Sequence, residues 1–274
     1  MSVTITAADI NKLRQTTGAG MLDCRKALTE SNGDFEAAID WLRKQGQKVA
    51  AKRSDREAKE GVVIAQTTAD HKSGIVLCIS CETDFVSKNA DFVAFAQSIA
   101  DAAIANDVKT AEELNGVTVN GAKVEELIND KLAAIGEKIA VSKFERVDAP
   151  YVASYIHGAN RMGVLVSMTK EAAEAGKDVA MQIAAMNPLA VDETSISQET
   201  KDREKAIAIE MIKAEGKPAE MAEKIADGKM NKFFKDNTLM HQAFVKDNSK
   251  SVADYLKSVD ADLKVTDFKR VALG

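Results

Sequence analysis

The stretch GIVLCISCETDFVSKN, residues 74–89, leads from a buried strand into a helix. Residues 75–79 are apolar and largely β-branched, which predicts a buried strand. From Asn89 onward apolar residues recur at helical spacing, and Asn89 itself is suited to cap the first turn. The segment between them, TDFV at residues 83–86, therefore forms a strand-to-helix connection, and such connections run over the surface.

Two interpretations of Phe85 follow from this position. A loop aromatic commonly folds back onto the following helix as a hydrophobic staple. The alternative is an exposed apolar side chain that lies beside the carboxylate of Asp84 and is directed at a partner protein.

Composition excludes several classes of function. The chain has 274 residues, enough for two domains, and a net charge of −5, whereas a protein that neutralises phosphates needs a surplus of Lys and Arg. No apolar run approaches the length of a membrane span, and residues 1–15 lack the charged start and apolar core of a signal peptide. We therefore expect a cytoplasmic protein that binds neither membranes nor nucleic acid.

The cysteines are Cys24, Cys78 and Cys81, an odd number that fits a reducing compartment. Cys78 and Cys81 spell C-x-x-C, but a redox pair of this kind needs its first thiol at a helix N-terminus. In a strand, positions three apart point to opposite faces, and a zinc site would need two further ligands. A thiol-redox protein using Cys78 and Cys81 remains the weaker alternative.

Residues 1–45 carry the pattern of three short helices. Thr6 with Asp9 three residues later predicts a capping box at the first of them. So short a segment gives a small module rather than an enzyme, and we place this module at residues 1–52. The charged, alanine-rich residues 47–60 connect it to the body.

The body reads as two related halves, 53–148 and 149–274. In the first half, strands and amphipathic helices are expected at 62–68, 74–80, 89–103, 123–135 and 139–147. Residues 152–168 repeat the hairpin, with Gly163 in the place of Gly74, and a helix follows through Ile183. This repetition predicts an α+β fold of two hairpin-plus-helix subdomains.

An insertion interrupts the second half. Residues 197–228 predict two charged helices joined at 216–218, which would form a projecting antiparallel hairpin. Its thin apolar seam is expected to consist of Ile207, Met211, Met221 and Ile225. The hairpin would be available to a partner, including a second copy of the chain. A helix at 251–259 and a strand near 263–271 close the body.

Motifs for an enzyme are missing from the sequence. No phosphate-binding G-x-x-x-x-G-K-[ST] loop and no G-x-S-x-G or G-x-G-x-x-G motif occurs. His157 lies in the turn of the second hairpin, and no carboxylate is spaced to orient it as a general base. We expect no catalytic residue, metal, cofactor or bound nucleotide.

Three motifs together resemble one family. TGAGMLDCRKAL at 17–28, TDFV at 83–86, and HG followed by RMGVLV at 157–166 are similar, in the same order, to segments of the translation elongation factor Ts family. The resemblance covers nearly the whole chain. It implies a ubiquitin-associated-like N-terminal module, a core of two subdomains and an inserted coiled-coil hairpin. It also implies a guanine-nucleotide exchange factor for the GTPase elongation factor Tu.

The same resemblance implies which residues contact the partner. Asp84 and Phe85, flanked by Thr83 and Val86, would enter its GTPase domain and disturb the magnesium and phosphate site. The further contacts implied are Arg14, Met21 and Arg25 of the N-terminal module, His157 of the second hairpin, and Val245.

The sequence departs from the family pattern at a few positions. Leu22 and Arg25 replace a Met and a Lys that are common in relatives, and Lys246 stands where some relatives have an apolar residue. Some relatives continue beyond Gly274 with a helix that packs on the partner. A scaffold that binds a helical partner through the module and the hairpin, without affecting nucleotide, remains the alternative function.

Overall fold

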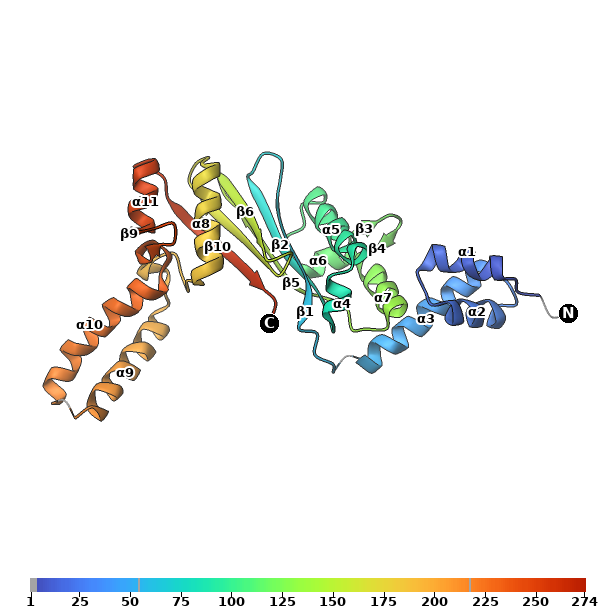
Figure 1. Ribbon diagram of the computed structural model, residues 1–274, viewed down its shortest axis with the longest axis horizontal. Helices are drawn as coiled ribbons and strands as arrows, with labels where there is room; N and C mark the ends of the chain where they lie inside the picture. The colour runs from blue at the N-terminus through green and yellow to red at the C-terminus, as the bar shows by residue number, and fades with distance from the viewer. Residues whose placement is uncertain (1–3, 54, 217) are drawn as a thin grey trace.

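Two three-stranded antiparallel sheets form the centre of the molecule (Figure 1). The computed structural model describes residues 4–53, 55–216 and 218–274. The first sheet has the order β1-β2-β5 and the second the order β10-β7-β6. Their strands are β1 (Glu60–Thr67), β2 (Ser73–Cys81), β5 (Ala140–Asp148), β6 (Tyr151–His157), β7 (Met162–Met168) and β10 (Val265–Ala272). In each sheet a hairpin comes first, helices follow, and a third strand pairs with the hairpin's second strand. The mixture of helices and antiparallel sheets agrees with the predicted α+β class.

The two sheets pack face to face through a shared apolar layer. Val76 of β2 and Leu165 of β7 are both fully buried in it. A Cβ atom added to Gly163 would lie 2.9 Å from Val76 Cγ2, and one added to Gly74 would lie 2.8 Å from Val152 Cγ1. The two glycines that the sequence pattern made equivalent thus both lie between the sheets, at positions with no space for a side chain.

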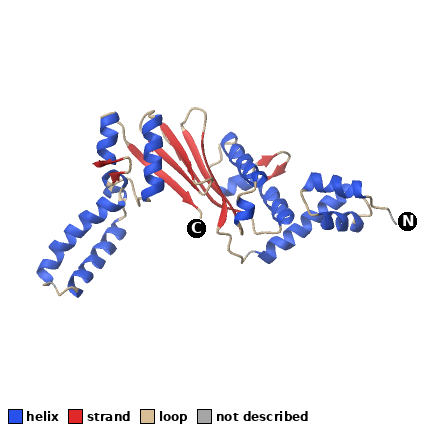
Figure 2. Cartoon of the chain, in the orientation of Figure 1, coloured by secondary structure: helices blue, strands red, loops and turns tan. Residues whose placement is uncertain are grey.

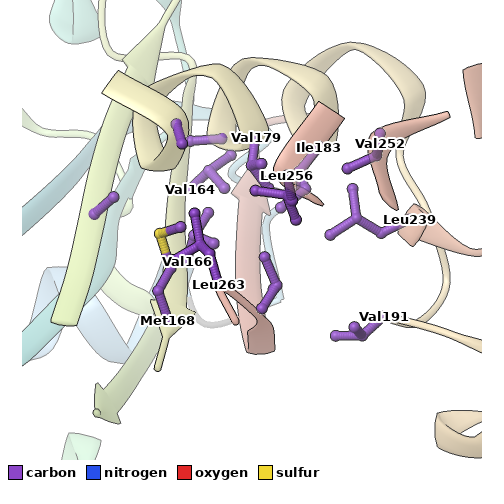
Figure 3. Packing of buried hydrophobic residues seen from close by; sticks show 14 of the residues in the cluster. Val164, Val166, Met168, Val179, Ile183, Val191, Leu239, Val252, Leu256 and Leu263 are labelled. Atoms are coloured by element: carbon purple, nitrogen blue, oxygen red, sulfur yellow. The ribbon is translucent and has the colours of Figure 1, made fainter. Parts of the chain in front are cut away.

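Helices cover the outer faces of both sheets (Figure 1). The first sheet is covered by α5 (Ala90–Ala105), with α4 (Asp84–Ser87), α6 (Ala111–Gly116) and α7 (Val124–Ile135) around it. The second is covered by α8 (Ala173–Met186) and α11 (Val252–Val259), whose side chains meet those of β7 in the cluster drawn in Figure 3. The short elements between them are β3 (Thr118–Val119), β4 (Ala122–Lys123), η1 (Glu193–Ser195), η2 (Leu239–His241), β8 (Ala243–Phe244) and β9 (Asp247–Ser251).

The N-terminal helices are α1 (Ala7–Thr17), α2 (Met21–Glu30) and α3 (Phe35–Arg53). They bury a small core of their own around Leu13, Cys24 and Leu28, and the Thr6–Asp9 capping box is confirmed. The third helix is longer than the sequence pattern indicated, since it continues to Arg53 through the first half of the segment expected as a connector. It packs on α7, where a Cβ on Gly46 would lie 2.8 Å from Ala133 Cβ.

The inserted hairpin consists of α9 (Gln198–Ala214) and α10 (Ala219–Asn237) and projects from the end of the molecule opposite the N-terminal helices (Figure 2). Its second helix runs past the expected end at residue 228. The helices meet through Ala208, Ile212, Ala222 and Ala226.

Three of the four residues expected in the hairpin seam are therefore wrong. Ile207, Met211 and Met221 are 44%, 55% and 54% exposed, and only Ile225 packs beside the seam. Alanines on both helices let the two axes approach, so the contact is turned by one residue away from the larger side chains. Within residues 4–53, 55–216 and 218–274, none of the helices combines the length and apolar character that crossing a membrane requires.

Candidate partner-binding site

Phe85 projects from a single helical turn. After β2 the chain makes α4, whose N-cap position is Thr83, and then enters α5, where the Asn89 side chain accepts the N–H groups of Asp91 and Phe92 as predicted. Val86 packs against the core between the first sheet and its helices, whereas Phe85 is 86% exposed. The staple interpretation of Phe85 is therefore wrong, since a staple would be covered by its helix.

Asp84 lies beside Phe85 with its carboxylate half exposed. Lys88, one turn later, donates a hydrogen bond of 2.6 Å to Asp84 Oδ2. This bond lowers the pKa of Asp84 below its ordinary value, so the carboxylate stays ionised at neutral pH. The segment thus presents a large apolar ring and a negative charge next to each other.

The predicted contacts of the N-terminal module are all exposed to solvent. Arg14 lies on α1, and Met21 and Arg25 lie one turn apart on α2. Leu22, which the sequence offered only as a family difference, follows Met21 in α2 and is 80% exposed.

A groove of about 830 Å³ joins this module to Phe85. Its walls come from the α1–α2 loop, α3, α5 and α7, and Phe85 and Val86 lie on its border. Sequence reasoning missed the aromatic residues that line it: Trp41, with Lys26 Nζ 5.7 Å from the ring centre, and Phe95, with Lys131 Nζ 4.8 Å away. Their place in helical stripes gave no sign that an open groove would lie between the N-terminal helices and the helices of the first sheet.

His157 is exposed at the end of β6, and its Nδ1 lies 2.9 Å from the Tyr155 hydroxyl. The turn that follows is tied to the start of β1, because Arg161 forms a 2.9 Å ion pair with Glu60. Glu60 is the register partner of Cys81, two residues before Thr83. His157 and the TDFV segment therefore lie at the same end of the paired sheets.

Val245 lies apart from these residues, between β8 and β9. Its backbone N–H donates 2.8 Å to the side chain of Gln182, which is fully buried in α8. Lys246 reaches back to Asp178 on the same helix. Here the structure does not gather the predicted contacts into one patch: β9, which follows Val245, is near the opposite end of the molecule from α1 (Figure 1).

The C-x-x-C pair is split between two cores. Cys78 is buried between the sheets and Cys81 between the first sheet and its helices, as the strand alternation predicted. Burial raises the pKa of Cys81 to about 12 and also raises that of Cys78, so neither thiol is activated. In the part of the chain that the structure describes, no group of His, Cys, Asp and Glu side chains could hold a metal ion.

Known proteins match this chain over most of its length. The family described as "Elongation factor TS" matches residues 82–274. The chain belongs to the elongation factor Ts family. A relative named "Elongation factor Ts" from Christiangramia forsetii is 51% identical over 273 residues, covering 98% of this chain and 99% of its own length. Relatives with the same name from Flavobacterium psychrophilum and Amoebophilus asiaticus are 50% and 48% identical, and each is covered to 99%.

Membership of the elongation factor Ts family establishes the function class. This chain is a guanine-nucleotide exchange factor for elongation factor Tu in translation elongation, a role in which no covalent bond is made or broken.

Proposed function

We propose that the chain promotes GDP release by inserting Phe85 and Asp84 into the GTPase domain of elongation factor Tu. The observation that carries the proposal is the exposure of Phe85, 86% of whose surface faces solvent on an ordered helical turn. A large apolar side chain held in water is the feature that a partner would bury. Burying it would contribute about 1.5–3 kcal/mol to binding.

The negative charge of Asp84 would weaken the binding of GDP and Mg²⁺ to elongation factor Tu. A carboxylate next to bound phosphates and Mg²⁺ repels the phosphates and competes for the cation. An exchange factor binds the empty partner more tightly than the loaded one, and by linkage nucleotide then weakens the factor equally. Burial of Phe85 would stabilise the complex with nucleotide-free elongation factor Tu, and the charge of Asp84 would destabilise the complex with GDP-bound elongation factor Tu.

The other contacts serve affinity in this proposal. Arg14, Met21 and Arg25 would dock the N-terminal module, taken as residues 1–52 with a ubiquitin-associated-like arrangement. Subdomain 53–148 would carry the TDFV segment, while His157 and Val245 of subdomain 149–274 would bind the body of elongation factor Tu. No cofactor, direct nucleotide contact, nucleic acid or membrane has a part in this function, which belongs to the cytoplasm, where translation takes place.

The deciding experiment measures release of a fluorescent GDP analogue from purified elongation factor Tu, with and without this protein. Acceleration by the wild-type chain, and its loss in Phe85→Ala at saturating concentration, supports the proposal. Binding without acceleration would favour the scaffold function instead.

The hairpin supports a separate proposal of self-association. Ile207, Met211 and Met221 are exposed on its outer surface, where a second copy of the hairpin could cover them. Sedimentation velocity over a range of protein concentrations tests this directly. A monomer at every concentration would remove the homodimer.

A further inference from the structure

The turns at residues 82–83 and 137–138 are joined by hydrogen bonds to the carboxylates of Glu137 and Glu82. Glu137 Oε2 accepts the backbone N–H groups of Glu82 at 3.1 Å and of Thr83 at 3.0 Å. Glu137 Oε1 accepts the Thr83 hydroxyl at 2.6 Å. In return, Glu82 Oε1 accepts the backbone N–H of Lys138 at 2.7 Å. The residues immediately before Asp84 and Phe85 are thus fixed by charge-assisted hydrogen bonds, which are stronger than neutral ones.

Glu82 also binds the end of the N-terminal module. Its Oε1 lies 2.7 Å from Nη1 of Arg53, the last residue of α3, and its Oε2 lies 3.0 Å from Nη1 of Arg56. Lys138 Nζ donates to the Arg56 carbonyl at 3.0 Å. The Glu82 carboxylate therefore contacts both the end of the N-terminal module and the 137–138 turn. Glu82 itself directly precedes the TDFV segment.

Ionisation of Glu82 persists over the whole physiological range. Its pKa is lowered to about 2, first by the Lys138 N–H and then by the arginines. The side chain is mostly covered, so solvent screens these contacts less than those of a surface pair. The carboxylates of Glu82 and Glu137 are both engaged within the chain, so these residues would affect exchange only through the side chains and backbone groups that they bind.

We propose that Glu137 and Glu82 are positioning residues for nucleotide exchange, with separate effects. Glu137, through Thr83, sets the direction in which α4 presents Asp84 and Phe85. Glu82, through Arg53 and Arg56, sets the orientation of the N-terminal module relative to that turn. This inference rests on the proposed function of Phe85 and assigns Thr83 a supporting role in place of direct contact.

The separate effects predict different kinetic defects. Glu137→Ala lowers the saturating rate of GDP release by about tenfold, the loss expected for a charge-assisted hydrogen bond. Glu137→Gln, which keeps one acceptor oxygen for the Thr83 hydroxyl or the N–H pair, recovers most of that rate. Glu82→Gln keeps an acceptor for the Lys138 N–H but loses the ion pairs. It raises the half-saturating concentration and leaves the saturating rate near that of the wild type.

Thr83 provides a second matched pair. Thr83→Val removes the hydroxyl donor while keeping the shape, and Thr83→Ser keeps the donor. The saturating rate of GDP release should fall in Thr83→Val as it does in Glu137→Ala, and in Thr83→Ser it should stay near that of the wild type. Asp227→Asn, which removes a carboxylate from a 2.8 Å surface pair with Lys205 on the hairpin, is the control for loss of charge alone.

Amide hydrogen exchange of the free protein gives a readout that does not depend on the partner. The N–H groups of Glu82 and Thr83 should exchange faster in Glu137→Ala, while amides of β2 keep their protection. In the double variant with Phe85→Ala, the two rate losses should fail to add, because Glu137 acts only through that turn.

Three results are distinguishable. Wild-type protein that does not accelerate GDP release contradicts the proposed function itself. Accelerated amide exchange in Glu137→Ala with a wild-type saturating rate contradicts the positioning role and leaves the function of Phe85 intact. Additive losses with Phe85→Ala contradict it as well, because Glu137 would then act elsewhere.

Discussion

Phe85 and Phe268 show how the same three residues acquire different roles. Thr-Asp-Phe occurs at 83–85 and again at 266–268. The second copy lies in β10, where Phe268 is half-buried opposite Val166 and packs on the second core. Only the first copy ends a strand and opens a helix, so only its phenylalanine is left in solvent.

Alanine substitution should separate these roles. Phe85→Ala should slow catalysed GDP release while leaving the melting temperature unchanged, because the ring makes few contacts within the chain. Phe268→Ala should lower the free energy of unfolding by about 2 kcal/mol, less than the 3–5 kcal/mol of a fully buried phenylalanine, and keep exchange activity. Thermal melts and GDP-release assays on both variants check this. A destabilised but fully active Phe85→Ala would remove the insertion mechanism.

Glu82 predicts a pH dependence of stability. Its folded-state pKa is about 2 against an ordinary value of 4.5, so its stabilising contribution is complete above about pH 4.5 and is lost as the pH falls towards 2. Glu82→Gln should therefore be less stable than the wild type at pH 7, with the difference shrinking below pH 4.5. Urea unfolding at a series of pH values measures it. A difference that stays constant down to pH 2.5 would show that the carboxylate charge contributes nothing.

At the scale of elements, the α9–α10 hairpin is held by a short apolar seam that lies apart from the main cores. Replacing residues 206–226 by a short glycine linker should leave the body folded, since closing a short loop costs little. This cut removes the seam residues of both helices and preserves the α10 segment around Met230, which is buried. The deletion should retain GDP exchange and lose any self-association. Loss of the cooperative melting transition would show that the hairpin belongs to the core.

The exposed methionines of the hairpin offer a milder test of the same element. Met211→Glu combined with Met221→Glu should abolish concentration-dependent association and leave the helical content intact, because both side chains already face solvent. Sedimentation velocity and circular dichroism report the two properties separately. Unchanged association would place the dimer interface elsewhere.

For the whole molecule, the N-terminal module packs on the body through the contact between α3 and α7. A side chain at Gly46 has no room beside Ala133, whereas Gly228 in α10 has no described atom within 4 Å of an added Cβ. Gly46→Leu should therefore displace the module and raise the concentration needed for half-maximal exchange, while the saturating rate persists. Gly228→Leu is the matched control and should bind normally. A lost saturating rate in Gly46→Leu would mean that the module does more than dock.

Local chemistry by itself determined much of this protein. The Thr6 and Asn89 caps and the alternation that separates Cys78 from Cys81 depend on neighbours within a few residues, so they can be read from the chain. The three family motifs likewise identify the TDFV segment from the order of the amino acids alone.

Tertiary structure decided what depends on distant residues. The hairpin seam differs from the expected one by a single helical position, because packing between the two helices buries Ala208 and Ile212 in place of the adjacent Ile207 and Met211. Exposure of Phe85 depends on whether any element covers its turn, and Thr83 is held by Glu137, 54 residues further along the chain. No local pattern encodes such a pairing, since a surface glutamate and an anchoring glutamate have the same sequence surroundings until the chain folds.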